Sequence, residues 1–477
     1  MSASSFICMI PVRNILLLLT SLVSSAFAGA KGKAPVNFVL INLDDSGYGD
    51  FSCYGATGYH TPNIDRMAAE GLRFTHFEAA QPVSGASRCG LMTGCYPNRL
   101  GFRGAPGPGS GMRLNPAETT VAEMLRDRGY ATAAIGKWHL GDARESLPLH
   151  HGFDEFYGLP YSNDMGPAHP THPERYPDLP LYDGDEVVAL NPDQSHLTAD
   201  YTARAVDFIR RNRRGPFFLY LAHSMPHVPL AVGDRFKGRS GAGLYGDVMM
   251  ELDWSTGRIL EEIDKLGLSR NTLVILTSDN GPWLNFGNWA GSAGGFREGK
   301  MTTWEGGNRV PCICLWKGRI KPGGICNGLA SNIDFLATFA ELSGARMPGL
   351  LTDGVSLVPL LDAPDSPSPR KIFAYYYKGS ELRAVTDGRF KLVFPHESLS
   401  YAGGTVGKDG RPGKAARFKV AAEELYDLST DPGERIDVIG LYPEKAAALR
   451  EAAAAVRKDL GDSLTGVEGS GLRLIKQ

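Results

Sequence analysis

Cysteine is scarce in this chain: 7 of the 477 residues are cysteine, and no two have the C-x-x-C spacing typical of zinc sites. An excess of charge is also missing, because 50 lysine and arginine residues face 52 aspartate and glutamate residues. This balance argues against a nonspecific nucleic-acid binder with a basic surface. Glycine is abundant, with 58 residues, but it lacks the repeat of collagen. The 43% hydrophobic content indicates a folded protein with many tight loops.

Long apolar runs are absent as well, except near the N-terminus. The run 15–23 follows a single charge, Arg13, and leads to the small-residue cleavage site Ala26-Phe27-Ala28. This pattern predicts a secretory signal peptide over residues 1–28, with export to the periplasm or the medium. The run is short for a membrane span, so we expect no stable membrane anchor. An uncleaved N-terminal anchor is the alternative.

Short apolar segments alternate with helical patterns from residue 35 to about residue 365. This alternation predicts an α/β fold, in which a mainly parallel central sheet lies between layers of helices. Strand patterns lie at 36–43, 132–135, 216–222 and 272–277, and helical patterns at 63–70, 118–127, 197–211 and 247–266.

The sequence changes character after the segment 362–370, which is rich in proline, serine and aspartate and is typical of a linker. Short strand patterns follow at 371–378 and 388–394, and the segment 424–427 precedes the turn Asp431-Pro432-Gly433. An alanine-rich helical pattern then covers 444–460. Residues 371–477 are therefore expected to form a C-terminal subdomain with a small antiparallel sheet and a helix.

Acidic side chains follow two of the predicted strands. Asp44 and Asp45 come directly after the first, and Asp279 and Asn280 follow the strand 272–277. Open α/β sheets bind ligands at the carboxyl ends of their strands. Adjacent carboxylates repel unless a cation compensates them, and their oxygen atoms suit Ca²⁺ or Mg²⁺. Either loop alone is equally typical of solvated acids, but the pair favours a metal site.

A segment between these two loops carries a specific resemblance. Pro82-Val83-Ser84-Gly85-Ala86-Ser87-Arg88, followed by Leu91-Met92-Thr93-Gly94, resembles the signature of the sulfatase family. The resemblance extends from about residue 35 to about residue 440. The other matching segments are 44–50, 61–65, 71–75, 136–141, 152–158, 300–307 and 425–432.

The resemblance implies an alkaline-phosphatase-like fold, with residues 35–365 as the catalytic domain, and hydrolysis of sulfate esters. In this family the first signature residue is oxidised to formylglycine (3-oxoalanine), whose hydrated form attacks sulfur. Ser84 occupies that position. The common aerobic pathway modifies cysteine, so a serine implies maturation by a radical-SAM sulfatase-maturating enzyme, found mainly in bacteria.

The resemblance also implies a role for each matching residue. Asp44, Asp45, Asp279 and Asn280, with Ser84, would hold Ca²⁺ or Mg²⁺. Arg88 would hold the hydrated aldehyde, and His139 would take its proton. The sulfate group would contact Lys137, His227 and Lys300, with Ser162 touching substrate. His227 would also protonate the leaving oxygen.

Local chain geometry adds four expectations. Arg88 lies one helical turn beyond Ser84 if a helix begins there. Lys137 and His139 would share one face of an extended segment. Pro226 and Pro229 exclude a regular helix that would pair His223 with His227 as metal ligands. Trp283, between Asn280 and Lys300, is a candidate for stacking on a sugar or aryl ring, with packing as the alternative.

The sequence therefore predicts an exported sulfatase acting on sulfated saccharides or aryl sulfates. A phosphomonoester or phosphonate hydrolase of the same superfamily is one alternative. A catalytically silent sulfate-binding protein with unmodified Ser84 is another. The sulfated sugar, the ester position and the oligomeric state stay open.

Overall fold

The computed structural model describes residues 35–475, of which residues 36–475 belong to one compact unit. The predicted signal peptide, residues 1–28, lies outside the described residues. Within residues 35–475 no helix has the length and apolar character needed to cross a membrane.

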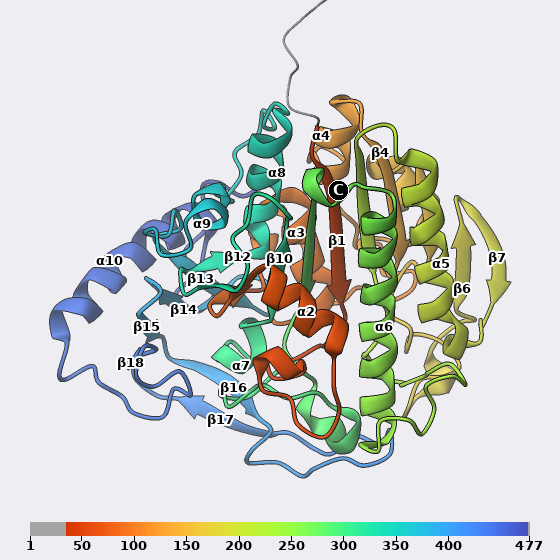
Figure 1. Cartoon of the computed structure of the whole chain (residues 1–477). Coiled ribbons are helices and arrows are strands. Elements are labelled where there is room, and N and C mark those ends of the chain that lie inside the picture. The colour runs from red at the N-terminus through yellow and green to blue at the C-terminus, as the bar shows by residue number, and fades with distance from the viewer. Residues whose placement is uncertain (1–34, 476–477) are drawn as a thin grey trace, which may run out of the picture. The chain divides into compact units, whose positions relative to one another are not determined.

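A ten-stranded sheet forms the centre of this unit (Figure 1), in the order β11-β2-β10-β9-β1-β8-β4-β5-β6-β7. The neighbours β9, β1, β8, β4 and β5 are parallel, whereas β10, β6 and β7 pair in antiparallel fashion. The predicted mainly parallel sheet is confirmed, and the outer strands are additions to it. The bounds are β1 (Asn37–Leu43), β2 (Leu72–Phe74), β4 (Ala131–Gly136), β5 (Glu155–Gly158), β6 (Pro180–Asp183), β7 (Glu186–Leu190), β8 (Phe217–Ala222), β9 (Thr272–Ser278), β10 (Cys312–Leu315) and β11 (Gly324–Cys326).

Successive side chains of a strand point to opposite sides of the sheet. Apolar side chains therefore emerge on both faces, and helices cover both. On β1, Phe38 and Leu40 pack into one core with α3, α4 and α8. Val39 and Ile41 pack into the other core with α2, α5 and α6. Strand β1 is therefore buried along its whole length and carries the apolar run 38–41, as is typical of a strand covered on both faces. The helices are α2 (Pro62–Glu70), α3 (Ser84–Thr93), α4 (Val121–Asp127), α5 (Gln194–Asn212), α6 (Gly243–Lys265) and α8 (Phe335–Ser343).

Two helix starts bear on the predictions. Helix α3 begins at Ser84, so Arg88 does lie one turn further along it. Helix α4 begins at Val121, and the predicted start at residue 118 is wrong. Thr120 caps this helix through a reciprocal pair of hydrogen bonds with Glu123, of 3.1 and 2.7 Å. Glu118 instead forms an ion pair with Arg473 at 2.8 Å.

The C-terminal part contains the predicted antiparallel sheet and helix. The sheet order is β13-β14-β15-β18, and a separate hairpin, β16–β17, lies beside it (Figure 1). Lys391 on β15 forms a buried ion pair with Glu305 at 2.9 Å, which ties this sheet to the preceding chain. The division of the chain at 365–371 stays a prediction. The elements are β13 (Phe373–Tyr377), β14 (Glu381–Thr386), β15 (Phe390–Val393), β16 (His396–Ser400), β17 (Ala416–Val420), β18 (Glu424–Asp427) and α10 (Pro443–Leu460).

Candidate active site

The acidic ends of β1 and β9 lie side by side, because Leu43 pairs with Ser278 in the parallel register. The backbone N–H of Asp45 donates to Asp279 Oδ1 at 3.2 Å. The Asn280 amide donates to Asp45 Oδ1 at 2.8 Å. Asp45 has a left-handed backbone, with φ of 64°, which turns the chain sharply at the end of the strand. The expected meeting of the two acidic loops is thus present.

Ser84, the first residue of α3, points into this acidic group. Its hydroxyl lies 3.0 Å from Asp44 Oδ1 and 3.3 Å from Asn280 Oδ1. A hydroxyl has a single proton and cannot donate fully to both acceptors. Hydroxyl, carboxylate and amide oxygen atoms are therefore concentrated here, and this donor set fits a hard divalent cation.

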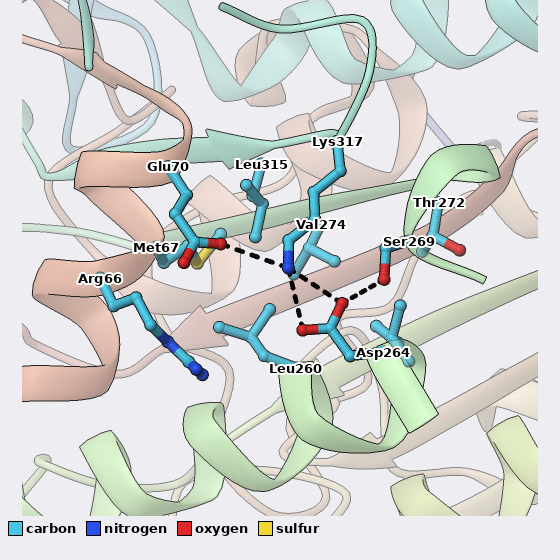
Figure 2. Close-up of a pocket in the computed structure, with 11 residues that line it drawn as sticks. Arg66, Met67, Glu70, Leu260, Asp264, Ser269, Thr272, Val274, Leu315 and Lys317 are labelled. Atoms are coloured by element: carbon cyan, nitrogen blue, oxygen red, sulfur yellow. Dashed lines mark hydrogen bonds and ion pairs between the residues drawn. The ribbon is translucent and has the colours of Figure 1, made fainter. Parts of the chain in front are cut away.

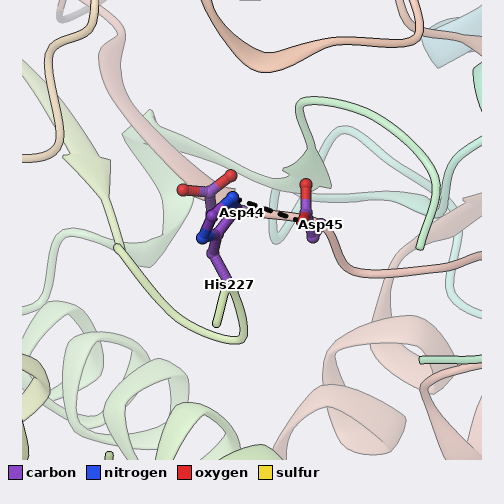
Figure 3. A group of neighbouring side chains, drawn as sticks. All are labelled: Asp44, Asp45 and His227. Carbon is purple, nitrogen blue, oxygen red and sulfur yellow. Dashed lines mark ion pairs between the residues drawn. The ribbon is translucent and has the colours of Figure 1, made fainter. Parts of the chain in front are cut away.

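A histidine, His227, completes the acidic group. Asp44, Asp45 and His227 each place one potential ligand atom within 4.8 Å of the others, and all three are buried (Figure 3). His227 Nε2 lies 3.6 Å from Asp45 Oδ2, and its Nδ1 lies 2.6 Å from the carbonyl oxygen of Val228. The carboxylate and histidine cluster has the composition of a metal site. The backbone contact fixes which ring nitrogen faces the cluster.

Arg88 balances part of the negative charge of Asp279 and Asp44. Its Nε and Nη2 lie 2.9 and 2.8 Å from Asp279 Oδ2, and Nη2 is 3.8 Å from Asp44 Oδ2. Burial by itself would lower the pKa of Arg88, but Asp279, Tyr220 and Asp44 together reverse this effect and raise the pKa. A third contact, from Nη1 to the carbonyl oxygen of Lys137 at 2.9 Å, fixes the guanidinium. Arg88 is thus a permanent, immobile cation.

Lys137 approaches Asp44 from the end of β4. Its ammonium forms an ion pair with Asp44 and lies 3.1 Å from the hydroxyl oxygen of Ser162. Burial would raise the pKa of Asp44, but Lys137, His227 and Arg88 together lower it. Burial lowers the pKa of Lys137 and Asp44 opposes that shift. We assign the ionised form to both groups, because each is the other's nearest opposite charge.

His139 corrects one expectation. Its backbone is left-handed, with φ of 64°, so the segment is not extended and the predicted sharing of one face with Lys137 is wrong. Its Nε2 lies 3.1 Å from the carbonyl oxygen of Pro106, and its buried Nδ1 has no partner within residues 35–475. Burial, assisted by the charges of Lys137 and Arg88, holds its pKa well below the usual value. The ring is therefore neutral and can accept a proton only at a cost.

Lys300 pairs with Asp45, whereas Lys137 pairs with Asp44. The Lys300 ammonium lies 2.7 Å from Asp45 Oδ1 and 4.5 Å from the ring centre of Trp283. Burial would lower the pKa of Lys300, but Asp45 and Asp44 raise it. The Trp283 ring also lies 5.6 Å from the His227 ring. Trp283 therefore touches two of the predicted sulfate-binding groups, a packing role that its position in the sequence leaves undetermined.

The structure brings nearly all of the predicted site residues together. Each of them except His139 has a hydrogen bond or ion pair to another member of the set. His223 points away, with Nε2 3.1 Å from Ser255 Oγ on α6, and residues 223–229 form no helix. Sequence reasoning missed Tyr220, whose hydroxyl lies 3.3 Å from Arg88 Nη1. An aromatic residue in the middle of an apolar strand gives no signal for such a contact.

A separate pocket lies at the other end of the sheet (Figure 2). Thr272 and Val274, at the start of β9, contribute to its lining, whereas Asp279 follows the end of that strand. Its main polar feature is Lys317, whose ammonium lies 3.3 Å from Glu70 and 2.9 Å from Asp264. These partners are themselves partly exposed, and the pocket has no part in the acidic site.

A mainly parallel sheet between helices, with acids at its strand ends and buried cations around a serine, is the arrangement of an alkaline-phosphatase-like hydrolase. The sequence model described as Sulfatase matches residues 36–345, and the chain belongs to the sulfatase family. It is accordingly an enzyme that hydrolyses sulfate esters.

Two relatives and one solved structure illustrate the similarity. Arylsulfatase A of Homo sapiens is 40% identical over 458 residues, which cover 90% of this chain and 89% of the relative. N-acetylgalactosamine-6-sulfatase of Mus musculus is 37% identical over 472 residues, with coverage of 93% and 89%. The crystal structure of PsFucS1 sulfatase from Pseudoalteromonas sp. superposes with a TM-score of 0.80 at 28% identity, covering 94% of this chain and 95% of that one.

Proposed function

We propose that this sulfatase releases inorganic sulfate from sulfated saccharides, using a nucleophile derived from Ser84 and one divalent cation. The observation that carries the proposal is the position of the Ser84 hydroxyl, 3.0 Å from Asp44 and 3.3 Å from Asn280. Three buried basic side chains, Arg88, Lys137 and Lys300, belong to the same site. The name of the N-acetylgalactosamine-6-sulfatase relative supports a sugar sulfate as substrate. Aryl sulfates are the second substrate class, supported by the name of arylsulfatase A.

The proposed cation site consists of Asp44, Asp45, Asp279 and Asn280, together with the modified side chain at position 84. A bound Ca²⁺ would polarise a sulfate oxygen and favour the ionised form of the attacking hydroxyl. Mg²⁺ is the alternative, but Ca²⁺ suits a site with many protein oxygen atoms better.

The remaining residues act on the sulfate group and on protons. Lys137 beside Asp44 and Lys300 beside Asp45 would neutralise the sulfate oxygens as charge develops on them. Arg88 fixes Asp279 and would hold the nucleophile. Neutral His139 would accept the proton released when sulfate is expelled, and Ser162, beside Lys137, would touch the substrate.

Oxidation of Ser84 to formylglycine is the step that makes this site catalytic. We expect the peptide that contains Ser84, isolated from enzyme made in its native host, to have lost two hydrogen atoms relative to the sequence. Fragmentation should place the loss at Ser84 and leave Ser87 on the same peptide unchanged. Full activity with intact serine would overturn the proposal, and an inactive protein with intact serine would indicate a sulfate binder.

Export and maturation belong to the same proposal. The signal peptide would direct the chain to the periplasm or the medium, and a radical-SAM maturating enzyme would modify Ser84 before folding buries it. Co-expression with such an enzyme should raise the specific activity in a heterologous host in proportion to the modified fraction. Activity that does not follow this fraction would contradict the link.

His227 is the proposed acid for the leaving oxygen, and its loss should depend on the substrate. His227→Ala should slow hydrolysis of a sugar sulfate by about 10²-fold or more, because an alcohol leaves poorly without a proton. Hydrolysis of an aryl sulfate with an acidic phenol should fall far less. Steady-state rates on the two substrates measure the difference.

His223→Ala is a matched control for this substrate test. It also removes a buried histidine, but one that contacts Ser255 on α6. It should lower stability without changing the ratio of the two rates. An equal loss on both substrates in His227→Ala would argue that His227 binds sulfate only.

A further inference from the structure

Lys300 lies in a short loop whose backbone is disfavoured for its sequence. Glu298 has φ of 57° and Met301 has φ of 66°, both in the left-handed region that non-glycine residues rarely occupy. Such conformations persist only where surrounding contacts hold them. The position of the Lys300 ammonium therefore depends on what holds residues 298–301 in place.

Two of the holding contacts come from the core of the site. The backbone N–H of Lys300 donates to the carbonyl oxygen of Pro282 at 2.9 Å, beside the metal-loop residue Asn280. The backbone N–H of Met301 donates to the carbonyl oxygen of Pro82 at 2.8 Å, beside Ser84. These bonds link the loop to both halves of the acidic site.

Further contacts to the loop come from the end of strand β16, in the C-terminal hairpin β16–β17. The Glu298 carboxylate accepts from the Ser400 hydroxyl at 2.8 Å and from the backbone N–H of Tyr401 at 2.6 Å. The Tyr401 hydroxyl donates to the carbonyl oxygen of Lys300 itself at 2.6 Å. Glu298, Lys300 and Tyr401 are all buried. One aromatic side chain thus fixes the peptide that carries the sulfate-facing lysine.

We propose that Tyr401 and Glu298 are positioning residues for Lys300, so that the C-terminal hairpin influences the affinity of the enzyme for the sulfate group. The inference rests on the proposed role of Lys300 in binding sulfate. Lysine has a long flexible side chain, and its ammonium makes an ion pair with Asp45 and lies over the face of Trp283. A small shift of the backbone would move the ammonium relative to both partners and to the substrate.

The test replaces Tyr401 with phenylalanine, which removes only the hydroxyl. KM for a sugar sulfate and the inhibition constant of inorganic sulfate should both rise about fivefold, the effect of losing one well-placed hydrogen bond. kcat should change less, because the lysine contacts sulfate in the bound substrate as well as in the transition state. Glu298→Ala should have the same effect, and Glu298→Gln, which keeps an accepting oxygen, should restore much of the affinity.

Tyr376→Phe is the matched control. Tyr376 is also buried, and its hydroxyl donates to the carbonyl oxygen of Gly461 at 2.8 Å, in the same part of the chain. Both tyrosine variants should lower the melting temperature to a similar extent. Only Tyr401→Phe should weaken inhibition by sulfate, and equal sulfate inhibition in the two variants would overturn the inference.

Lys300→Ala separates this inference from the function on which it rests. If Lys300→Ala keeps the wild-type inhibition by sulfate, the proposed role of Lys300 is wrong and the inference fails with it. If Lys300→Ala loses inhibition and Tyr401→Phe does not, Lys300 binds sulfate but the hairpin does not position it. Loss in both, with Tyr376→Phe unaffected, supports the proposal.

Discussion

Ser84→Ala should reduce turnover of sulfate esters by about 10³-fold or more, the loss expected when an enzyme is deprived of its nucleophile. Alanine cannot be oxidised to an aldehyde and offers no oxygen to attack sulfur. The rest of the site should remain folded, because Ser84 contributes only its hydroxyl contacts to Asp44 and Asn280. The loss of these contacts should cost about 1 kcal/mol of stability. Rates on a sugar sulfate and an aryl sulfate, with a melting curve, measure both effects.

Ser87→Ala provides the control for this experiment. Ser87 lies on the same helix and is equally buried, but its hydroxyl accepts a hydrogen bond from the Asn332 amide at 2.9 Å. Ser87→Ala should lose a comparable amount of stability and keep its turnover. Ser84→Ala should still bind inorganic sulfate, because Lys137, His227 and Lys300 are intact. Substantial turnover by Ser84→Ala would refute a nucleophile at this position.

The sequence predicts the centre of this protein better than its edges, for a physical reason. Strands buried on both faces, such as β1 and β9, carry continuous apolar runs, 38–41 and 273–276, and the acids that follow them mark the functional end of the sheet. Edge strand β7 also carries an apolar run, but Val187, Val188 and Leu190 are all exposed, so its apolar residues do not indicate burial. Its place in the sheet comes from pairing with β6, which no local pattern records.

The site shows the same limit. The residue types that bind an anion and a cation lie in recognisable strings, so the predicted residues gather as expected. The backbone of His139 was not predictable, because a positive φ at a non-glycine residue is imposed by its surroundings. The contact between Tyr401 and Lys300 joins residues 101 positions apart. Tyr401 directly follows β16, a strand with little apolar character. Such a contact needs the fold to bring its partners together.

Divalent cations should raise the stability of the folded protein by a large amount. Asp44, Asp45 and Asp279 are buried within one site, and a cation held there binds the folded state in preference to the unfolded chain. At a concentration one hundred times the dissociation constant, such binding adds about 2.7 kcal/mol to the free energy of unfolding. Ca²⁺ should act at lower concentrations than Mg²⁺, because Mg²⁺ gives up its water reluctantly. Melting temperatures measured against each free cation, after treatment with a chelator, give the two dependences.

Asp279→Asn should abolish the stabilisation by Ca²⁺ and remove activity together. The variant loses one proposed cation ligand and leaves Arg88 without its closest buried partner, now 2.8 Å from Asp279. Breaking a buried ion pair in this way costs about 3–5 kcal/mol, so the variant should also melt well below the wild type in the presence of chelator.

Asp253→Asn separates the effect on the cation from the general cost of losing a buried acid. Asp253 lies on α6 and accepts hydrogen bonds from the backbone N–H groups of Asn63 and Ile64, at 2.9 and 2.8 Å. Its loss should destabilise the protein but leave the Ca²⁺-dependent rise in melting temperature unchanged. A wild-type protein that melts at one temperature with chelator and with excess Ca²⁺, and keeps its activity in both, would rule out a resident cation. In that case Arg88, Lys137 and Lys300 alone would have to balance the three carboxylates. Their positive charges would then be used up within the site, and none would remain to bind the sulfate group.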